Sequence, residues 1–303
     1  MLTAWSVAAM AAKWLAYGTC FLATGTTLFL LASKGLIDIQ AKPSFKLHLR
    51  RAILTMVVLA LLASLAQMVV QAGRLLDDGL AGMVDPEMIG IVYEGALGNS
   101  VTVRLIGLAM IAVAALRNWK YAVFLVFAGP GALLVATSFS LVGHATQEPR
   151  WLLTLLVTIH VLAVSFWIGA LLPLYRAASG LLPLPIAAHL AHRFGQQATL
   201  IVPLLIVAGG VLSYQFVGTW AAMFTTQYGL TLALKLALVA SLLLLASANK
   251  FRIVPDMLAG SDSAARRLQR TIRLEAIAFM LILVVTSVLT TATPLPPLQL
   301  VSQ

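Results

Sequence analysis

The chain has 303 residues, of which 61% are hydrophobic and only 10% are charged, and its formal net charge is +10. A mean hydropathy of +0.97 excludes an ordinary soluble protein, because soluble domains carry about 25% charged residues. The single cysteine, Cys20, excludes a disulfide framework or a CxxC metal clamp within one chain.

Eight apolar stretches are long enough to cross a bilayer, where a chain segment satisfies its own backbone only as a helix. The first stretch lacks the basic region and cleavage site of a signal peptide, so we expect it to stay as a permanent span. The predicted fold is all-α: a polytopic membrane helix bundle that forms one integral membrane domain over 1–303. The predicted helices cover 5–32, 52–73, 98–116, 121–142, 151–174, 197–217, 229–249 and 274–293.

Basic residues alternate between the loops. Of the 20 lysines and arginines, 15 fall in the segments that join spans 1–2, 3–4, 5–6 and 7–8. The positive-inside rule therefore predicts that both termini are periplasmic, on the side called outer below. Because the charge follows topology, it does not indicate nucleic acid as a partner.

The outer loops are instead acidic and contain soft or imidazole ligands. The segment between spans 2 and 3 holds Asp77, Asp78, Asp85, Glu87 and Glu94 together with Met83 and Met88. Met68 lies in the outer half of span 2, and His144 follows span 4. Thioether and imidazole donors suit cuprous copper. Each methionine alone more often serves packing, so this placement predicts a cation-binding side rather than a defined site.

His160 lies deep in the fifth span. It follows Trp151 by nine residues, which places it roughly 13 Å below the outer boundary of a core about 30 Å thick. Trp167, seven residues on, shares its helical face. Such an imidazole is either a satisfied buried side chain or a ligand of a metal or haem, or a proton carrier. A straight span 4 would leave His144 about 10 Å above it, whereas a kink at Gly129-Pro130-Gly131 would bring the two together.

Four charged residues fall inside predicted spans: Lys13, Arg104, Lys235 and Glu275. A charge at the bilayer centre costs at least about 2.5 kcal/mol, so such groups either pair inside the bundle or snorkel to the headgroups. Lys13 and Arg104 lie near outer ends and Glu275 near an inner end, so snorkelling suits these three. Lys235 lies further from a boundary.

Motifs from about 140 to 294 resemble the copper resistance protein D (CopD) family of inner-membrane proteins, and the first half resembles it more loosely, around GNSVTVRLIGLA. The pattern includes GHA at 143–145, then His160, Trp167, Gly169 and Pro173 in the spacing H-x6-W-x-G-x3-P. It continues with RFGQQATLIVPLLIVAGGVLS, with QYGLTLALKLALVASLLLLASANKFRIVP and with RRLQRTIRLEAIAFMLILVVTSVLTTATP.

The resemblance implies copper transport, as Cu(I) or Cu(II), from the periplasm towards the cytoplasm, commonly with a separate CopC-type periplasmic copper-binding partner. His144 would accept copper at the outer mouth and His160 would bind it inside the bundle, with Met68, Met83 and Met88 as auxiliary ligands. Trp167 would lie beneath the site, and Gly169 would allow close helix contact. Arg104, Lys235 and Glu275 would lock or gate the bundle, since a cationic side chain cannot ligate a metal.

This interpretation makes the chain a transporter rather than an enzyme, and no nucleotide-binding motif is present in the sequence. Two alternatives stay open at this stage. One is a haem-binding membrane redox protein, which needs two axial ligands at a similar depth. The other is a copper-binding sensor or assembly protein that does not transport.

Overall fold

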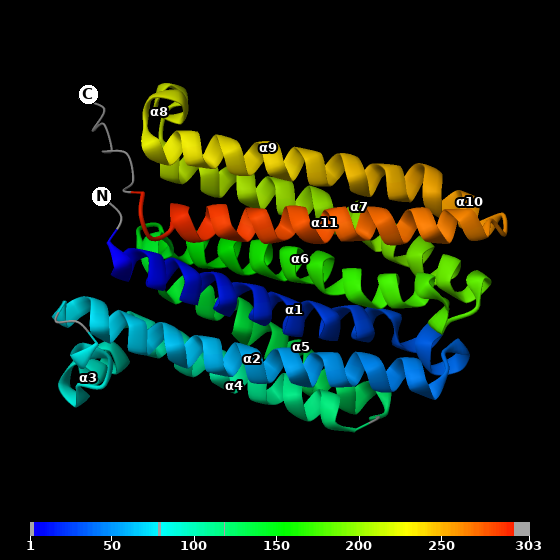
Figure 1. Ribbon diagram of the computed structural model, residues 1–303, viewed down its shortest axis with the longest axis horizontal. Coiled ribbons are helices and arrows are strands. Elements are labelled where there is room, and N and C mark those ends of the chain that lie inside the picture. The colour runs from blue at the N-terminus through cyan, green and yellow to red at the C-terminus, as the bar shows by residue number, and fades with distance from the viewer. Residues whose placement is uncertain (1–2, 78–79, 118, 294–303) are drawn as a thin grey trace.

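The computed structural model describes residues 3–77, 80–117 and 119–293, which form a long bundle of helices (Figure 1). Asp78, one of the acidic residues of the loop between spans 2 and 3, and the C-terminal tail at 294–303 lie outside the described residues. Eight helices in the described part are long and apolar enough to cross a membrane, which confirms the predicted number. They are α1 (Ala4–Gln40), α2 (Pro43–Leu76), α4 (Ala96–Leu116), α5 (Tyr121–Ser138), α6 (Arg150–Arg176), α7 (Leu184–Val217), α9 (Gln227–Ala248) and α11 (Asp262–Leu289).

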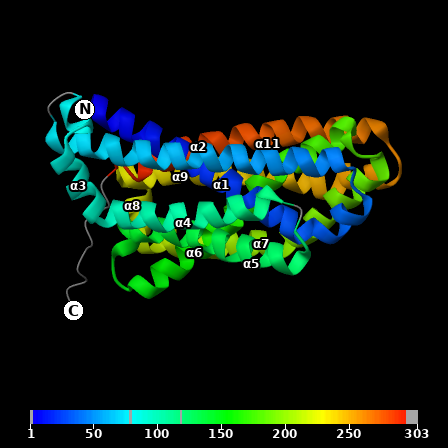
Figure 2. The same cartoon turned by 90° about the horizontal axis from the view of Figure 1, so that it is seen from below.

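Helix α1 runs through the middle of the bundle and divides it into two groups. It packs along α2 and α5 on one side and along α6 and α11 on the other. Helix α4 joins α2 and α5 in the first group, and α7 and α9 join the second, which places α4 and α9 at opposite edges of the bundle in Figure 1; Figure 2 shows the same helices from below. The buried residues of α1 are mostly small, such as Ala16, Ala23 and Gly25, so neighbouring helices approach it closely.

Several helices extend beyond the predicted spans. Helix α1 has 37 residues, about 55 Å at 1.5 Å per residue, which exceeds a hydrocarbon core of about 30 Å. Short elements that the sequence did not predict fill the connections. They are the 3₁₀ turns η1 (Ala81–Met83), η2 (Phe139–Leu141) and η3 (Gly143–Thr146), the helices α3 (Pro86–Glu94), α8 (Trp220–Thr225) and α10 (Val254–Leu258), and the π-helical segments η4 (Ala177–Leu181) and η5 (Asn249–Ile253).

The two ends of the bundle differ in the loops they carry. Helix α1 begins and α11 ends at the end that also carries α3 and α8, whereas α10 and the basic connections lie at the opposite end (Figure 1). This arrangement is what an even number of crossings requires. The assignment of the first end to the periplasm stays a prediction from charge, and the two ends are called outer and inner on that basis.

Helix α5 stays helical through Pro130 and ends at Ser138. Neighbouring Gly131 lies against α4, where a built Cβ would stand 2.9 Å from the carbonyl oxygen of Gly107. After Ser138 the chain continues through η2 and η3, which carries His144 at the outer end. Of the two outcomes left open for the Gly129-Pro130-Gly131 segment, the structure therefore shows a continuous helix.

Candidate functional site

His160 lies within α6, ten residues after its first residue and thus about 15 Å along the helix. Its ring meets α7 at a glycine: a Cβ built on Gly209 would stand 3.1 Å from His160 Cε1 and 3.3 Å from Nδ1. Nδ1 is buried and forms no hydrogen bond of normal geometry, although the backbone of Leu205 on α7 lies close enough to act on the ring. A buried polar atom without a partner is rare in folded proteins and calls for an explanation, such as a bound ion. The imidazole is therefore available to a ligand in the middle of the bundle.

His144 lies in η3 between two aromatic rings. Its ring centroid is 5.7 Å from that of Phe216 at the end of α7, and 6.3 Å from that of Tyr228 at the start of α9. Partial burial lowers the pKa of His144 below its usual 6.5, and the positive charge of Lys13 lowers it further. The imidazole thus favours the neutral form that can bind a metal.

The two histidines occupy different depths of the same helix group. His160 faces Gly209 and His144 faces Phe216, seven residues later on α7. Seven residues correspond to about 10 Å along a helix, whereas a copper or zinc ion binds its ligands at about 2 Å. His144 and His160 therefore cannot hold the same ion in this structure.

The three candidate methionines lie on the α2 side of the molecule. Met68 is in α2, Met88 is in α3, and Met83 in η1 contacts Gly73 of α2, where a built Cβ would stand 2.7 Å from Met83 Cγ. Elements η1 and α3 pack against α2, whereas both histidines contact α7. The structure does not bring these methionines to either histidine. Among the described residues, no group of three or more His, Cys, Asp or Glu side chains gathers in a metal-binding arrangement.

Trp167 and Glu275 form a buried polar contact one level below His160. Trp167 Nε1 donates to Glu275 Oε2 at 3.2 Å, and Asn249 Nδ2 donates to Oε1. Thr271 in turn donates to Asn249 Oδ1. Glu275 is 3% exposed, so the expected snorkelling is wrong for this residue. Its carboxylate is instead satisfied inside the bundle by neutral donors from α6 and η5.

Gly169 lies where α1 and α6 come into backbone contact. A Cβ built on Gly169 would stand 2.0 Å from the carbonyl carbon of Gly25 and 2.2 Å from the nitrogen of Thr26. Thr26 Oγ1 donates to the Gly169 carbonyl oxygen at 3.1 Å. Only glycine fits at this crossing, which fixes the helix that carries both His160 and Trp167.

Arg104 is fully buried between α2, α4 and α5, so the expectation that it snorkels is wrong as well. Its guanidinium donates to Ser138 Oγ at 3.2 Å and to Ser100 Oγ at 3.1 Å, with longer contacts of 3.5 Å to Ser64 and Gln67. The ring of Phe139 lies 4.3 Å from its central carbon. The positive charge is thus stabilised by hydroxyl, amide and aromatic groups, with no carboxylate partner among the described residues.

The two lysines inside spans behave differently. Lys13 Nζ donates to the carbonyl oxygen of Thr290, the residue that follows α11, at 2.8 Å. It thereby satisfies one of the free carbonyls at that helix end. Lys235 of α9 forms no ion pair within the described part of the chain, and its charge reaches His160. Lys235 and Glu275 therefore do not lock the bundle by pairing with each other.

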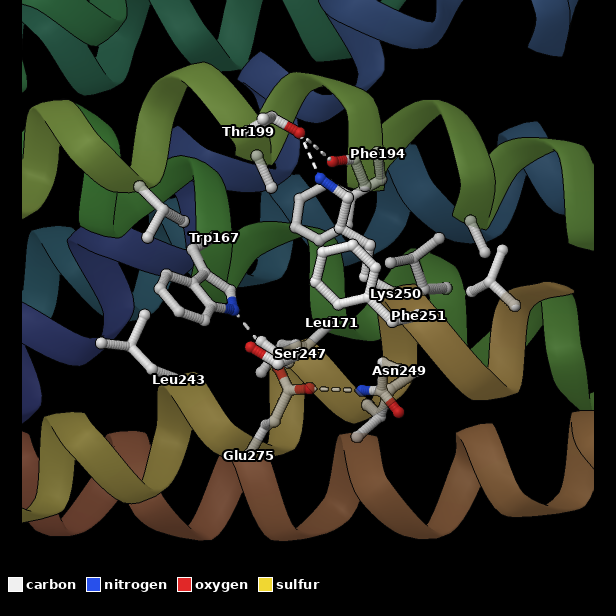
Figure 3. Close-up of a pocket in the computed structure, with 18 of the residues that line it drawn as sticks. Trp167, Leu171, Phe194, Thr199, Leu243, Ser247, Asn249, Lys250, Phe251 and Glu275 are labelled. Carbon is white, nitrogen blue, oxygen red and sulfur yellow. Dashed lines mark hydrogen bonds between the residues drawn. The ribbon is translucent and has the colours of Figure 1, made fainter.

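A cavity of about 280 Å³ opens beside the Trp167–Glu275 contact, between α6, α7, α9, η5 and α11 (Figure 3). Its walls are largely apolar, and Glu275 and Asn249 lie across it from Lys250 and Thr199. Lys250 Nζ donates to Thr199 Oγ1. Sequence reasoning missed Asn249, Lys250, Thr199 and Gly209, because nothing in their spacing relates residues that meet only after the helices pack.

Two family models match the chain. The model described as "Copper resistance protein D-like, N-terminal domain" matches residues 1–152, and the model "Copper resistance protein D" matches residues 188–289. The inner membrane protein YebZ of Escherichia coli (strain K12) is 25% identical over 256 residues, which cover 78% of this chain and 82% of that protein. No solved structure matches the chain.

Proposed function

Because the chain belongs to the copper resistance protein D family and is a multi-pass protein of the inner membrane, we propose that it carries copper from the periplasm towards the cytoplasm. The ion passes through the helix group formed by α6, α7, α9 and α11. His144 accepts it at the outer end, and His160 binds it about 10 Å deeper. A CopC-type periplasmic protein would supply the ion, and membrane lipid would surround the outer faces of the helices.

The observation that supports this proposal is the unpartnered Nδ1 of His160. An imidazole nitrogen in an apolar interior loses the hydrogen bond that water would give, at a cost of about 1–3 kcal/mol. A soft metal ion is the kind of partner that can offset this cost, because imidazole is a common ligand of copper. The structure thus leaves a metal-binding atom free where a copper path through this half of the bundle would run.

The sparse ligand set suits passage rather than storage. Conduction needs sites that bind an ion strongly enough to admit it and weakly enough to release it. A site with three or four fixed histidine or cysteine ligands would hold copper too tightly to pass it on. Single imidazoles at two depths meet this requirement better. The methionines on α2, η1 and α3 would then concentrate copper at the outer surface instead of lining the interior path.

A pair of neighbouring glycines provides a sharp test. In Gly209→Ala the new methyl group would stand 3.3 Å from His160 Nδ1 and crowd it, whereas Gly210 has no heavy atom within 4 Å of a built Cβ. We expect His160→Ala to remove the copper bound inside the bundle, Gly209→Ala to weaken that binding, and Gly210→Ala to bind like the parent. Copper uptake into proteoliposomes of known orientation should follow the same order. Unchanged stoichiometry in His160→Ala would refute the proposal.

The same purified protein also tests the alternative that the chain binds haem. All five histidines of the chain are described, and only His160 lies near the middle of the bundle. His189 and His192 lie at the inner end, in the first turns of α7, and His48 bonds the Ser44 carbonyl on α2. A single chain therefore lacks a second histidine at the depth of His160. The absence of a haem absorption band is the expected result, and a band lost in His160→Ala would favour the redox function.

A further inference from the structure

The cavity beside Glu275 has the shape and polarity of a small-molecule site. Three aromatic side chains face it, from three different elements: Trp167 of α6, Phe194 of α7 and Phe251 of η5. The remaining walls are mainly aliphatic, and the volume of about 280 Å³ approaches the lower limit of ligand pockets, about 300 Å³. Aromatic faces on several sides favour a flat ring, because offset stacking and edge contacts add to simple burial.

Two polar groups lie on opposite walls of this cavity. Glu275 is on one wall, and Lys250 with Thr199 is on the other (Figure 3). The Glu275 carboxylate accepts from Trp167 and Asn249 and has no ion-pair partner among the described residues. A carboxylate can accept about four hydrogen bonds and an ammonium can donate three. Glu275 can therefore accept from a ligand while Lys250 donates to it.

The cavity opens towards the membrane between α7 and α9. Thr199 of α7 and Ser247 of α9 line it and are exposed, and only 17% of the apolar window of each of these helices is buried. The π-helical segment η5 follows α9 and carries Asn249, Lys250 and Phe251 to the cavity. Wide turns of this kind occur frequently at functional sites. A ligand would thus arrive from the lipid phase.

We propose that this cavity binds a membrane-soluble aromatic diol of the quinol class. One hydroxyl donates to Glu275, and the oxygen at the opposite side of the ring accepts from Lys250. The ring lies among Trp167, Phe194 and Phe251, and an apolar tail leaves between α7 and α9. A phospholipid acyl chain would fill the same space but use neither polar wall. The proposal concerns binding alone and does not depend on copper transport.

The test uses the full-length protein in nanodiscs with radiolabelled tetramethyl-1,4-benzoquinol kept reduced by ascorbate, and empty nanodiscs as background. We expect saturable binding at one molecule per chain, and binding at least tenfold weaker for the dimethyl ether of the same quinol, which cannot donate. Partition equal to that of empty nanodiscs, or an ether that binds as tightly as the quinol, would overturn the proposal; the latter outcome would indicate an acyl-chain cavity.

Two variants of the same π-helical segment localise the site. Lys250→Met should weaken quinol binding about tenfold, the loss expected for a hydrogen bond to a charged group. Arg252→Met is the matched control, because Arg252 is exposed and does not line the cavity. If Lys250→Met is unstable, Ser247→Trp tests the same site by closing its exposed rim, and should abolish binding. Equal affinity in the parent, Lys250→Met and Ser247→Trp would contradict the assignment.

Discussion

Replacing Gly169 by alanine tests how closely α1 and α6 are held together. The new methyl carbon would stand 2.0 Å from the carbonyl carbon of Gly25, whereas ordinary contact begins at 3.4 Å. The two backbones would have to separate by about 1.4 Å. Inserting a methylene group into a packed interior costs about 1–3 kcal/mol when side chains can adjust. Because both partners here are backbone atoms, we expect the loss of unfolding free energy to reach at least the upper end of that range.

A second glycine gives a control of opposite sign. Gly35 also lies in α1, but a Cβ built there meets no heavy atom within 4 Å. Alanine is favoured over glycine in a helix interior by about 0.8–1.0 kcal/mol. Gly35→Ala should therefore be as stable as the parent or more stable. It makes the same chemical change as Gly169→Ala, in the helix against which α6 packs.

The assay is unfolding in a detergent titration, followed by circular dichroism, with thermal melting as a second measure. Copper binding is measured on the variants that remain folded. A shift of α6 against α1 also moves His160, so Gly169→Ala should lose copper affinity together with stability. If Gly169→Ala unfolds at the same detergent concentration as the parent, the backbone contact described between α1 and α6 is wrong.

Three further outcomes concern residues of both helix groups. His144→Ala should slow copper uptake into oriented proteoliposomes without abolishing binding at His160, and equal rates would remove His144 from the path. Because the pKa of His144 lies below 6.5, protons should compete with copper at this side chain only below that pH. On acidification, the copper uptake rate should therefore fall at a lower pH than the pKa of a free imidazole predicts. Lys13→Met should move this fall to a higher pH, since it removes a positive charge that lowers the pKa of His144. Arg104→Lys should lower the free energy of unfolding by about 1–3 kcal/mol, because an ammonium lacks the planar guanidinium that donates to both Ser100 and Ser138. An unchanged melting temperature would contradict this.

The number and order of the spans could be predicted from the sequence because the bilayer imposes one strong requirement. Each span must be apolar over about 20 residues and must satisfy its own backbone. The predicted extents are too short, since α1 and α7 continue beyond the apolar stretches with polar residues that a hydropathy threshold leaves out. The same requirement carries no information about which helices touch, so α1 could not be identified as the central helix.

The candidate site could be predicted only in part, because the sequence does not show which helices contact each other. The position of His160 within a span indicates its depth, but the residue that its ring meets, Gly209, lies 49 residues away in sequence. Arg104 and Glu275 stand out in the sequence because they are charged residues inside predicted apolar spans. Their partners are serines, a glutamine, a tryptophan and an asparagine on other helices, and such neutral residues are too common in spans to be singled out.

The burial of Arg104 also determines which part of the molecule can admit a metal cation. A permanent positive charge acts on a second unit charge 10 Å away with about 1.7 kcal/mol at an effective dielectric constant of 20. A cation in the interior bounded by α2, α4 and α5 would therefore be disfavoured by about this amount, however many methionines lie at the surface. The helix group that begins at α6 also contains a positive charge, since Lys235 acts on His160, but it holds the buried carboxylate of Glu275 as well. On the proposed copper path, the N-terminal helices would support the C-terminal helices and would not carry the ion themselves.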